Sequence, residues 1–248
     1  MSGEAELAGP IVLLAPMRPE LVPLARRLPL RREGEGDEAV YHGTLGGQAL
    51  AATLTGIGTQ RAARVTERIL DAGPVRHVVV VGVAGGVDPA LGIGDVVVPE
   101  RVVDHANGRE HRPAPLGHAT PRGTIMTTDE LFTAPDVHAQ LATEGVVALD
   151  METAAVAAVC ERRGCPWSVF RAISDRNADQ LVDEAILGLS RPDGRANLAA
   201  LARYLLPRPW RARRLARLGR DLKVATEAAA DAAAQALQET RRPPRRDP

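Results

Sequence analysis

The 248-residue sequence has few aromatic residues and few cysteines. Trp, Tyr and Phe make up 2% of it, and the two cysteines are Cys160 and Cys165. So few rings argue against a platform that stacks nucleic-acid bases. No cysteine or histidine lies at metal-binding spacing from these two cysteines, so we expect buried, reduced thiols and no metal site.

The sequence also lacks an excess of charge and a long apolar run. Its 31 basic residues balance 31 acidic ones, so nothing draws the whole chain to nucleic acid. No apolar run reaches the roughly 18 residues of a membrane-spanning helix. Acidic Glu4 and Glu6 stand where a secretory signal peptide is basic, so we expect a cytoplasmic location.

Short apolar runs alternate with stretches of helical periodicity. We expect strands at 11–15, 40–45, 48–54, 78–81, 92–98, 124–128, 146–148 and 168–173, a surface loop over 104–123, and helices starting near Pro19 and at 59–72, 136–143 and 151–163. This order predicts a three-layer α/β fold with a central mixed, mainly parallel sheet flanked by helices. We expect a single domain over 1–238, with a helical extension from about 188 and a disordered tail over 239–248.

Three carboxylates stand at the ends of apolar elements. Asp150 and Glu152 flank Met151 where a helix is expected to begin, and Asp175 follows the last predicted strand. Such carboxylates are costly unless they are paired or used. Ligands of open α/β sheets collect at the carboxyl ends of strands. The pattern therefore indicates a small-molecule site.

Five sequence blocks resemble the nucleoside phosphorylase superfamily, in particular the methylthioadenosine/S-adenosylhomocysteine nucleosidases. They are Ala15-Pro-Met-Arg-Pro-Glu20, Thr55-Gly-Ile-Gly58, Val81-Gly-Val-Ala-Gly-Gly-Val87 with Ile93-Gly-Asp-Val-Val97, Leu149-Asp-Met-Glu-Thr153 and Arg171-Ala-Ile-Ser-Asp175. The resemblance covers about residues 11–180. It implies cleavage of a nucleoside N-glycosidic bond by water or by phosphate, with adenine favoured as the base, no cofactor, and a homodimer.

The resemblance assigns Glu20 and Asp175 the catalytic roles. Glu20 would activate water, and Asp175 would protonate the purine at N7, with Ser174 fixing its orientation. Burial that raises the pKa of Asp175 would keep it protonated when needed. Two plainer interpretations stay open: Glu20 as an exposed first-turn acid beside Arg18, and Asp175 as a helix cap.

The resemblance assigns the ribose to Glu152 and Met151. Glu152 would accept hydrogen bonds from the 2′ and 3′ hydroxyls, bonds that strengthen as positive charge builds on the sugar. Met151 would lie against the ribose face. Asp150 replaces a glutamate common in the family and has a weaker claim, since a helix N-terminus favours an acid there anyway.

The remaining predicted contacts come from backbone turns and one ring. Gly58, Val83, Ala84 and Gly85 lie in glycine turns that let the backbone approach the sugar. Phe132 occupies a position where the family stacks a ring on the base, although core filling explains it equally well. Phosphorylases use an arginine and a hydroxyl side chain at the positions of Val80 and Val83, so hydrolysis is favoured over phosphorolysis.

Two segments depart from the family pattern. Residues 104–123 replace a segment that shapes the 5′ side of the pocket, and we expect the histidines there, His105, His111 and His118, to be solvated. The C-terminal part resembles the tail of hopanoid-associated nucleosidases, which release adenine from adenosylhopane. Its stretch 207–223 is basic and amphipathic, so it either contacts an anionic membrane or packs on the domain with its arginines in solvent.

Four functions therefore stay open. The favoured one is an adenine nucleosidase for methylthioadenosine or S-adenosylhomocysteine. The alternatives are a nucleosidase for a specialised adenosyl substrate such as adenosylhopane, a phosphorylase, and a nucleoside-binding sensor without turnover. The base, the 5′ substituent and the oligomeric state are not fixed by the sequence.

Overall fold

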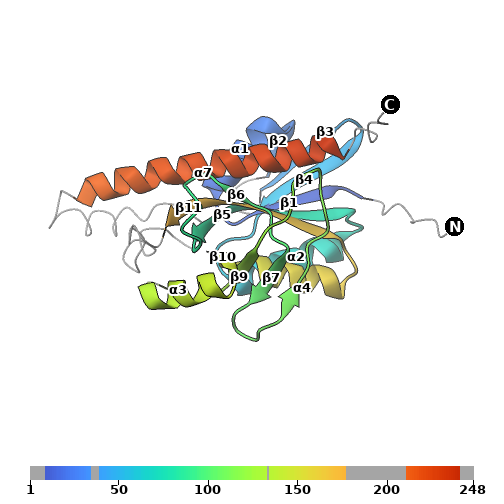
Figure 1. Ribbon diagram of the computed structural model, residues 1–248. Helices are drawn as coiled ribbons and strands as arrows, with labels where there is room; N and C mark the ends of the chain where they lie inside the picture. Colours follow the sequence, from blue (N-terminus) through green and yellow to red (C-terminus); the bar gives the residue numbers. More distant parts are fainter. Residues whose placement is uncertain (1–8, 35–38, 133, 177–210, 241–248) are drawn as a thin grey trace, which may run out of the picture.

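A single mixed sheet organises the protein. The computed structural model describes residues 9–34, 39–132, 134–176 and 211–240 (Figure 1). Its strands are β1 (Ile11–Ala15), β2 (Leu30–Glu33), β3 (Val40–Leu45), β4 (Gln48–Leu54), β5 (His77–Gly86), β6 (Val96–Val97), β7 (Arg101–Asp104), β8 (Glu110–His111), β9 (Thr124–Thr127), β10 (Val146–Asp150) and β11 (Trp167–Arg176). The described helices are α1 (Arg18–Arg27), α2 (Thr59–Ala72), α3 (Pro135–Thr143), α4 (Thr153–Arg162) and α7 (Arg211–Glu239).

The strand order confirms the predicted fold class. The strands run β2-β3-β4-β1-β5-β10-β9-β7-β8, and β11 pairs with β5 and β6. β5 lies at the centre, parallel to β1 and β11, and β9 is parallel to β7 and β10. The carboxyl ends of β1, β5 and β11 therefore meet at one edge, where ligands of such sheets bind.

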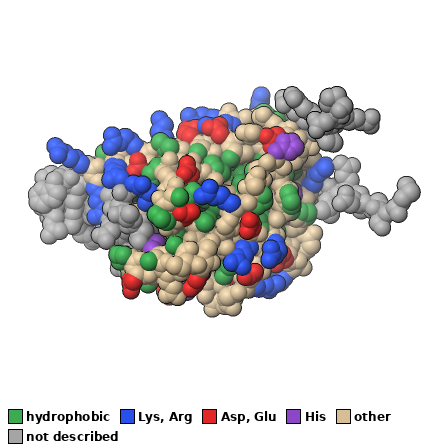
Figure 2. All heavy atoms as spheres, in the orientation of Figure 1, with side chains coloured by type: hydrophobic (Ala, Val, Ile, Leu, Met, Phe, Trp, Pro, Cys, Tyr) green, Lys and Arg blue, Asp and Glu red, His purple; other side chains and the backbone are tan. Residues whose placement is uncertain are grey.

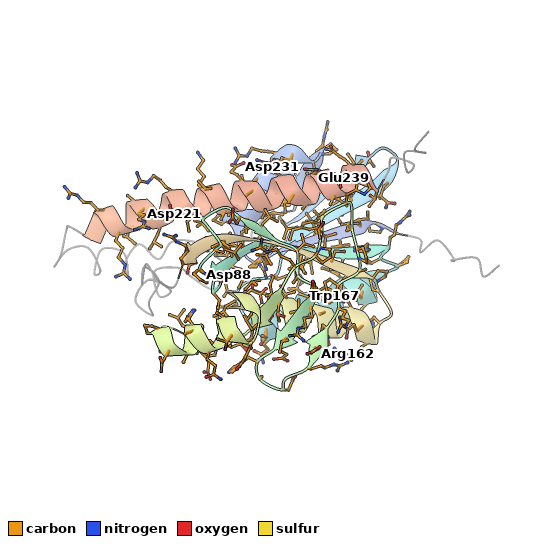
Figure 3. The ribbon with its side chains drawn as sticks, viewed as in Figure 1. Asp88, Arg162, Trp167, Asp221, Asp231 and Glu239 are labelled. Carbon is orange, nitrogen blue, oxygen red and sulfur yellow. The ribbon has the colours of Figure 1, made fainter. Side chains whose placement is uncertain are left out.

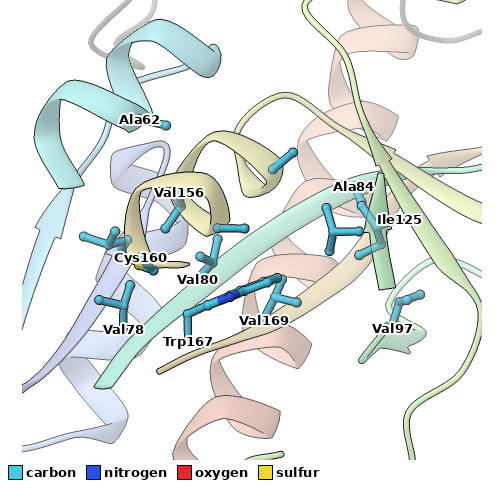
Figure 4. Close-up of a cluster of buried hydrophobic side chains, with 14 of the residues drawn as sticks. Ala62, Val78, Val80, Ala84, Val97, Ile125, Val156, Cys160, Trp167 and Val169 are labelled. Carbon is cyan, nitrogen blue, oxygen red and sulfur yellow. The ribbon is translucent and has the colours of Figure 1, made fainter. Parts of the chain in front are cut away.

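The sheet is buried on both faces because side chains alternate along β5. Val78 and Val80 pack with α2 and α4, in the cluster shown in Figure 4. Val79 and Val81 point the other way, into a cluster with α1 and α7. Continuous runs of β-branched residues suit strands that are covered on both faces. Figure 1 shows the three layers that result.

α7 lies along the sheet and is joined to α1 by ion pairs. Arg27 pairs with Glu227 at 2.6 Å and also with Asp231, and Arg26 reaches Glu227 at 3.1 Å. Figure 3 places Asp221, Asp231 and Glu239 along this helix. Exposed pairs of this kind contribute little individually, so buried alanines such as Ala229 and Ala233 supply most of the docking.

Several predicted boundaries were wrong. β5 and β11 continue through their glycine and Ser-Asp ends, because Gly85 and Gly86 pair with Asp175 and Arg176 across the two strands. Only Val96–Val97 of the predicted strand 92–98 pairs. The helix predicted from 151 begins at Thr153, because β10 continues to Asp150.

The predicted surface loop 104–123 contains part of a hairpin formed by β7 and β8. His111, expected in solvent, has a fully buried side chain because its Nδ1 lies 2.8 Å from Glu161 Oε2 and β8 packs beside α4. His105 and His118 are exposed as expected. Cys160 and Cys165 are buried free thiols.

The C-terminal predictions are only partly covered. α7 is helical from Arg211 and ends at Glu239, the residue at which the tail was expected to start. Residues 177–210 and 241–248, which include most of the predicted extension and the tail, lie outside the described residues.

Candidate active site

The centre of the site is Arg171, a fully buried arginine on β11. Its Nη2 lies 2.6 Å from Asp150 Oδ2 and 3.0 Å from Glu152 Oε2. Its Nη1 lies 3.9 Å from Glu20 Oε1 and has no hydrogen-bond partner among the described residues. Three carboxylates from three elements therefore surround one cation.

Glu20 reaches this centre from the first turn of α1 and is 1% exposed. Its Oε2 accepts a hydrogen bond from the Met17 amide at 2.7 Å, and its Oε1 accepts one from the Val83 amide at 2.8 Å. Burial raises the pKa of Glu20 to about 7, while Arg171 and the two amides oppose that rise. Glu20 is therefore not the exposed helix acid of the plainer interpretation.

Glu152 lies at the N-cap position of α4 and is 4% exposed. Its Oε1 accepts a hydrogen bond from the Gly58 amide at 3.0 Å, and its Oε2 accepts one from Arg171. Burial raises the pKa of Glu152 to about 7, with Arg171 opposing it and the neighbouring Asp150 charge adding to it. Each carboxylate oxygen keeps a second lone pair for another donor.

Asp150 is held entirely by protein groups. Its Oδ1 accepts from the Thr127 hydroxyl at 2.6 Å, and its Oδ2 accepts from Arg171 and from the Thr153 amide and hydroxyl. Its side chain has no exposed surface. This geometry makes Asp150 a partner that fixes Arg171, and it does not support the expected contact with substrate.

Asp175 lies near the end of β11, half-buried, and belongs to a separate part of the same edge. The Ser174 hydroxyl donates to its Oδ1 at 2.6 Å and also lies 3.5 Å from the Ala84 carbonyl. A side chain on Gly85 would come within 3.5 Å of Asp175 Oδ2. Ser174 therefore contacts the Asp175 carboxylate directly and links it to the Ala84 carbonyl. The amides of Val83 and Gly58 bind the carboxylates of Glu20 and Glu152, respectively.

Phe132 is half-buried beside the apolar cluster of Val87, Met126, Leu141 and Val146. The His105 ring meets it edge-on, with centroids 5.0 Å apart, and His138 Nε2 lies 2.7 Å from its carbonyl oxygen. Met151 is half-buried in the turn between β10 and α4. Phe132 thus packs against this cluster at its edge, an arrangement that core filling also explains.

Gly82 is the position where β5 leaves room for the site. A Cβ there would lie 2.3 Å from Glu20 Oε1 and 2.5 Å from Arg171 Nη1. Any side chain would therefore push these two groups away from the strand.

Sequence reasoning missed Arg171, Thr127, Thr153 and Gly82. Arg171 carried a usable signal, since an arginine inside the apolar run Val169–Ile173 must find buried carboxylates. The threonines carried none, because their partners become neighbours only when β9, β10 and α4 pack together.

In the described part of the chain, no three His, Cys, Asp or Glu side chains form a group that could hold a metal ion. Helices with the length and apolarity needed to cross a membrane do not occur in this described part either.

The buried arginine and its carboxylates lie at the carboxyl edge of a mixed sheet, where folds of this class bind small molecules. The model of the phosphorylase superfamily matches residues 10–121 and 110–207. The chain therefore belongs to the phosphorylase superfamily, and within it the chain is similar to 5′-methylthioadenosine/S-adenosylhomocysteine nucleosidases.

Two curated relatives illustrate the similarity in sequence. The nucleosidase of Shewanella frigidimarina is 27% identical over 206 residues, which cover 70% of this chain and 89% of that protein. The nucleosidase of Tolumonas auensis is 32% identical over 165 residues, which cover 54% of this chain and 72% of that protein.

Solved structures show the same fold at lower identity. The S-adenosylhomocysteine nucleosidase of Streptococcus pyogenes superposes with a TM-score of 0.70 at 21% identity, covering 98% of this chain and all of that one. The futalosine hydrolase of Helicobacter pylori superposes with a TM-score of 0.67 at 20% identity, covering 92% and 97%. Because enzymes with differently named substrates share the fold, the fold alone does not select the substrate.

Proposed function

We propose that this protein is a nucleosidase that hydrolyses the N-glycosidic bond of an adenine nucleoside of the methylthioadenosine or S-adenosylhomocysteine type. The observation that carries the proposal is the buried Glu20 carboxylate, held by two amides beside Arg171 at the carboxyl ends of β1 and β5. The family and the names of its relatives support the choice of adenine nucleosides.

Glu20 is the general base that takes a proton from the attacking water. A base works best when its pKa lies near the working pH, and burial raises the pKa of Glu20 to about 7. The Arg171 Nη1 group next to it has a hydrogen to donate to the same water. The pair can thus hold a water molecule and deprotonate it.

Glu152 binds the ribose hydroxyls. Gly58 and Arg171 fix both of its oxygens from the protein side, which leaves their second lone pairs for the substrate. Hydrogen bonds to an anionic acceptor strengthen as the sugar gains positive charge, so they favour the transition state over the ground state.

Asp175 protonates the departing base. Bond cleavage leaves negative charge on the purine, and a carboxyl group within hydrogen-bond reach of N7 neutralises it. The Ser174 hydroxyl holds Oδ1, which orients the carboxyl group. We assign the Phe132 ring to the base, and Met151, in the turn next to Glu152, to the ribose face.

Water is preferred over phosphate as the nucleophile because of the charges around Glu20. Three carboxylates surround Arg171, the one buried arginine or lysine among the described residues, and Val80 and Val83 offer no cationic or hydroxyl side chain. A phosphate site needs cations and donors in excess. A phosphorylase is the second alternative, after a nucleosidase for a specialised adenosyl substrate.

The test is base release, measured by chromatography, from methylthioadenosine, S-adenosylhomocysteine, adenosine and inosine, each with and without phosphate. Adenine release that is independent of phosphate supports the proposal and ranks the 5′ groups. No release from any of them favours a nucleoside-binding sensor or a specialised adenosyl substrate such as adenosylhopane.

The basic half of α7 favours the specialised substrate as a second candidate. Arg213, Arg220 and Lys223 are exposed, whereas Leu215 and Leu218 are half-buried, and Figure 2 shows basic side chains gathered over this end of the helix. We infer that the segment 207–223 contacts anionic lipid at the membrane surface. Residues 207–210 of this segment lie outside the described residues. Flotation with phosphatidylserine vesicles tests it, with an Arg213→Glu/Arg220→Glu variant as the control.

Two further properties are inferred from the resemblance to nucleosidases. They are assembly into a homodimer and residence in the cytoplasm. Light scattering at several concentrations tests the first, and fractionation of cells tests the second.

A further inference from the structure

The amide of Gly58 is one of the two protein donors that hold Glu152. It lies 3.0 Å from Glu152 Oε1. Gly58 is the N-cap residue of α2, and its φ of 97° lies in the region that favours glycine. Having no side chain, Gly58 cannot cap the helix or fix its own orientation. The direction of this amide therefore depends on what holds the first turn of α2.

Asp129 holds that turn from another part of the chain. It follows β9, 70 residues from Thr59, and its Oδ1 accepts a hydrogen bond from the Thr59 amide at 2.9 Å. Its Oδ2 accepts from the Thr59 hydroxyl. The first turn of α2 contains no acidic residue of its own. Asp129 thus supplies the cap and the negative charge that this helix N-terminus lacks.

The place of Asp129 is set by the same strands that place the carboxylate cluster. β9 runs parallel to β10, with Thr127 opposite Asp150, and the Thr128 amide donates to the Asp150 carbonyl at 2.9 Å. Asp129 is the next residue along. A continuous path therefore joins Asp129 to Thr59, Gly58 and Glu152.

We propose that Asp129 is a positioning residue that fixes the Gly58 amide on Glu152 and so sets the orientation of the ribose-binding carboxylate. The role of Glu152 toward ribose rests on the proposed function, whereas the path from Asp129 to Glu152 is independent of it. Asp129 touches none of the reacting atoms in this account and acts only through Gly58.

The first experiment measures hydrogen exchange of assigned backbone amides in the full chain, comparing wild type with Asp129→Ala. Exchange of the Gly58 amide should accelerate by about tenfold, because its acceptor geometry is lost. The Val83 amide, which is bonded to Glu20 and not to Glu152, is the internal control and should be unchanged. Glu130→Ala, at the adjacent exposed acid, is the matched control variant and should leave both amides unchanged.

The second experiment is a double-mutant cycle with Asp129→Ala and Glu152→Gln, read as kcat and KM for methylthioadenosine. Asp129→Ala alone should lower kcat/KM by about tenfold with a clear fall in kcat, because a misplaced carboxylate loses the ribose hydrogen bonds that strengthen in the transition state. In the Glu152→Gln background the same change should have little further effect. Asp129→Asn, which keeps an acceptor for the Thr59 amide, should recover part of the loss.

The outcomes separate the inference from the proposed function. Unchanged Gly58 exchange in Asp129→Ala overturns the inference, whatever the activity. Additive losses in the cycle also overturn it, since they indicate that Asp129 does not act through Glu152. A wild-type protein inactive on every nucleoside contradicts the proposed function, while the exchange result still decides the role of Asp129.

Discussion

Arg171 and Glu20 face each other inside the core, with Nη1 and Oε1 3.9 Å apart and neither side chain more than 1% exposed. The separation is longer than a hydrogen bond, and Nη1 has no partner among the described residues. In the proposed mechanism, the attacking water accepts a hydrogen bond from Arg171 Nη1 and gives a proton to Glu20. This relationship leads to the predictions that follow.

Replacing Glu20 with Gln should abolish most turnover while leaving nucleoside binding intact. The amide keeps the shape of the carboxylate but cannot accept a proton, so kcat should fall by about 10²- to 10⁴-fold. Adenine release measures kcat, and calorimetry with a nucleoside measures affinity. Glu33→Gln, at a side chain that is 70% exposed, is the matched control. Equal loss of affinity and turnover would assign Glu20 to binding instead.

The pH dependence of kcat/KM should show an acidic limb with an apparent pKa of about 7. Burial raises the pKa values of both Glu20 and Glu152 to about 7, and both must be ionised to act as base and acceptor. The rate should therefore fall below pH 7 in two overlapping steps, because repulsion between the two carboxylates separates the pKa values of the pair. A profile flat down to pH 5 would contradict ionised Glu20 as the base.

Replacing Arg171 with Met should destabilise the protein strongly, because three buried carboxylates lose the arginine that pairs with them. The loss of unfolding free energy should be about 3–5 kcal/mol. Arg162→Met is the control, since Arg162 is exposed and pairs with Glu67 on the surface. That control should cost about 1 kcal/mol or less. Chemical denaturation measures both variants.

The loss of unfolding free energy in Arg171→Met should also depend on pH. Glu20 and Glu152 have pKa values raised above 4.5 in the folded protein, so their contribution to stability is present below pH 4.5 and is lost as pH rises through 7. Without Arg171 these pKa values rise further. The difference between Arg171→Met and wild type should therefore be larger at pH 8 than at pH 5. An equal difference at both pH values would mean that the carboxylates do not sense the arginine.

Replacing Gly82 with Ala should damage activity more than the fold. The added Cβ would lie 2.3 Å from Glu20 Oε1 and 2.5 Å from Arg171 Nη1, so both groups must move from the positions in which they are proposed to activate water. We expect kcat/KM to fall by about 10²-fold. Gly73→Ala is the control, because its Cβ meets nothing within 4 Å and its backbone is extended. Unchanged kinetics in Gly82→Ala would show that the Glu20–Arg171 geometry is not critical.

The sequence predicted those elements whose signals are local. The strand Ile11–Ala15, the hairpin strands Val40–Leu45 and Gln48–Leu54 and the helix Thr59–Ala72 agree with the structure at both ends. Apolar runs, a Gly-Gly turn and helical periodicity each need only neighbouring residues.

The elements that were missed depend on pairing between distant residues. β2 is a mostly exposed strand, Leu30–Glu33, that forms because β3 lies beside it. β5 and β11 continue through glycines and a Ser-Asp pair, residues with weak strand preference, because each is the other's partner. Propensity cannot report a partner that lies about 90 residues away.

The site residues also divide into those that local sequence motifs indicate and those that depend on packing. The motif blocks indicated Glu20, Glu152 and Asp175. The first two lie together around Arg171, and Asp175 lies at the same sheet edge. The distinction between Asp150, which holds the arginine, and Glu152, which keeps lone pairs for a ligand, needed the positions of Thr127 and Thr153. That information lies in the packing of β9 and α4 and not in the spacing of the acids.

The most direct test of water activation by Glu20 is the identity of the sugar product formed from methylthioadenosine in phosphate buffer, resolved by mass spectrometry. This account predicts free methylthioribose, with adenine formed at the same rate when phosphate is omitted. Methylthioribose 1-phosphate as the product, with no adenine released in the absence of phosphate, would contradict it and make the protein a phosphorylase.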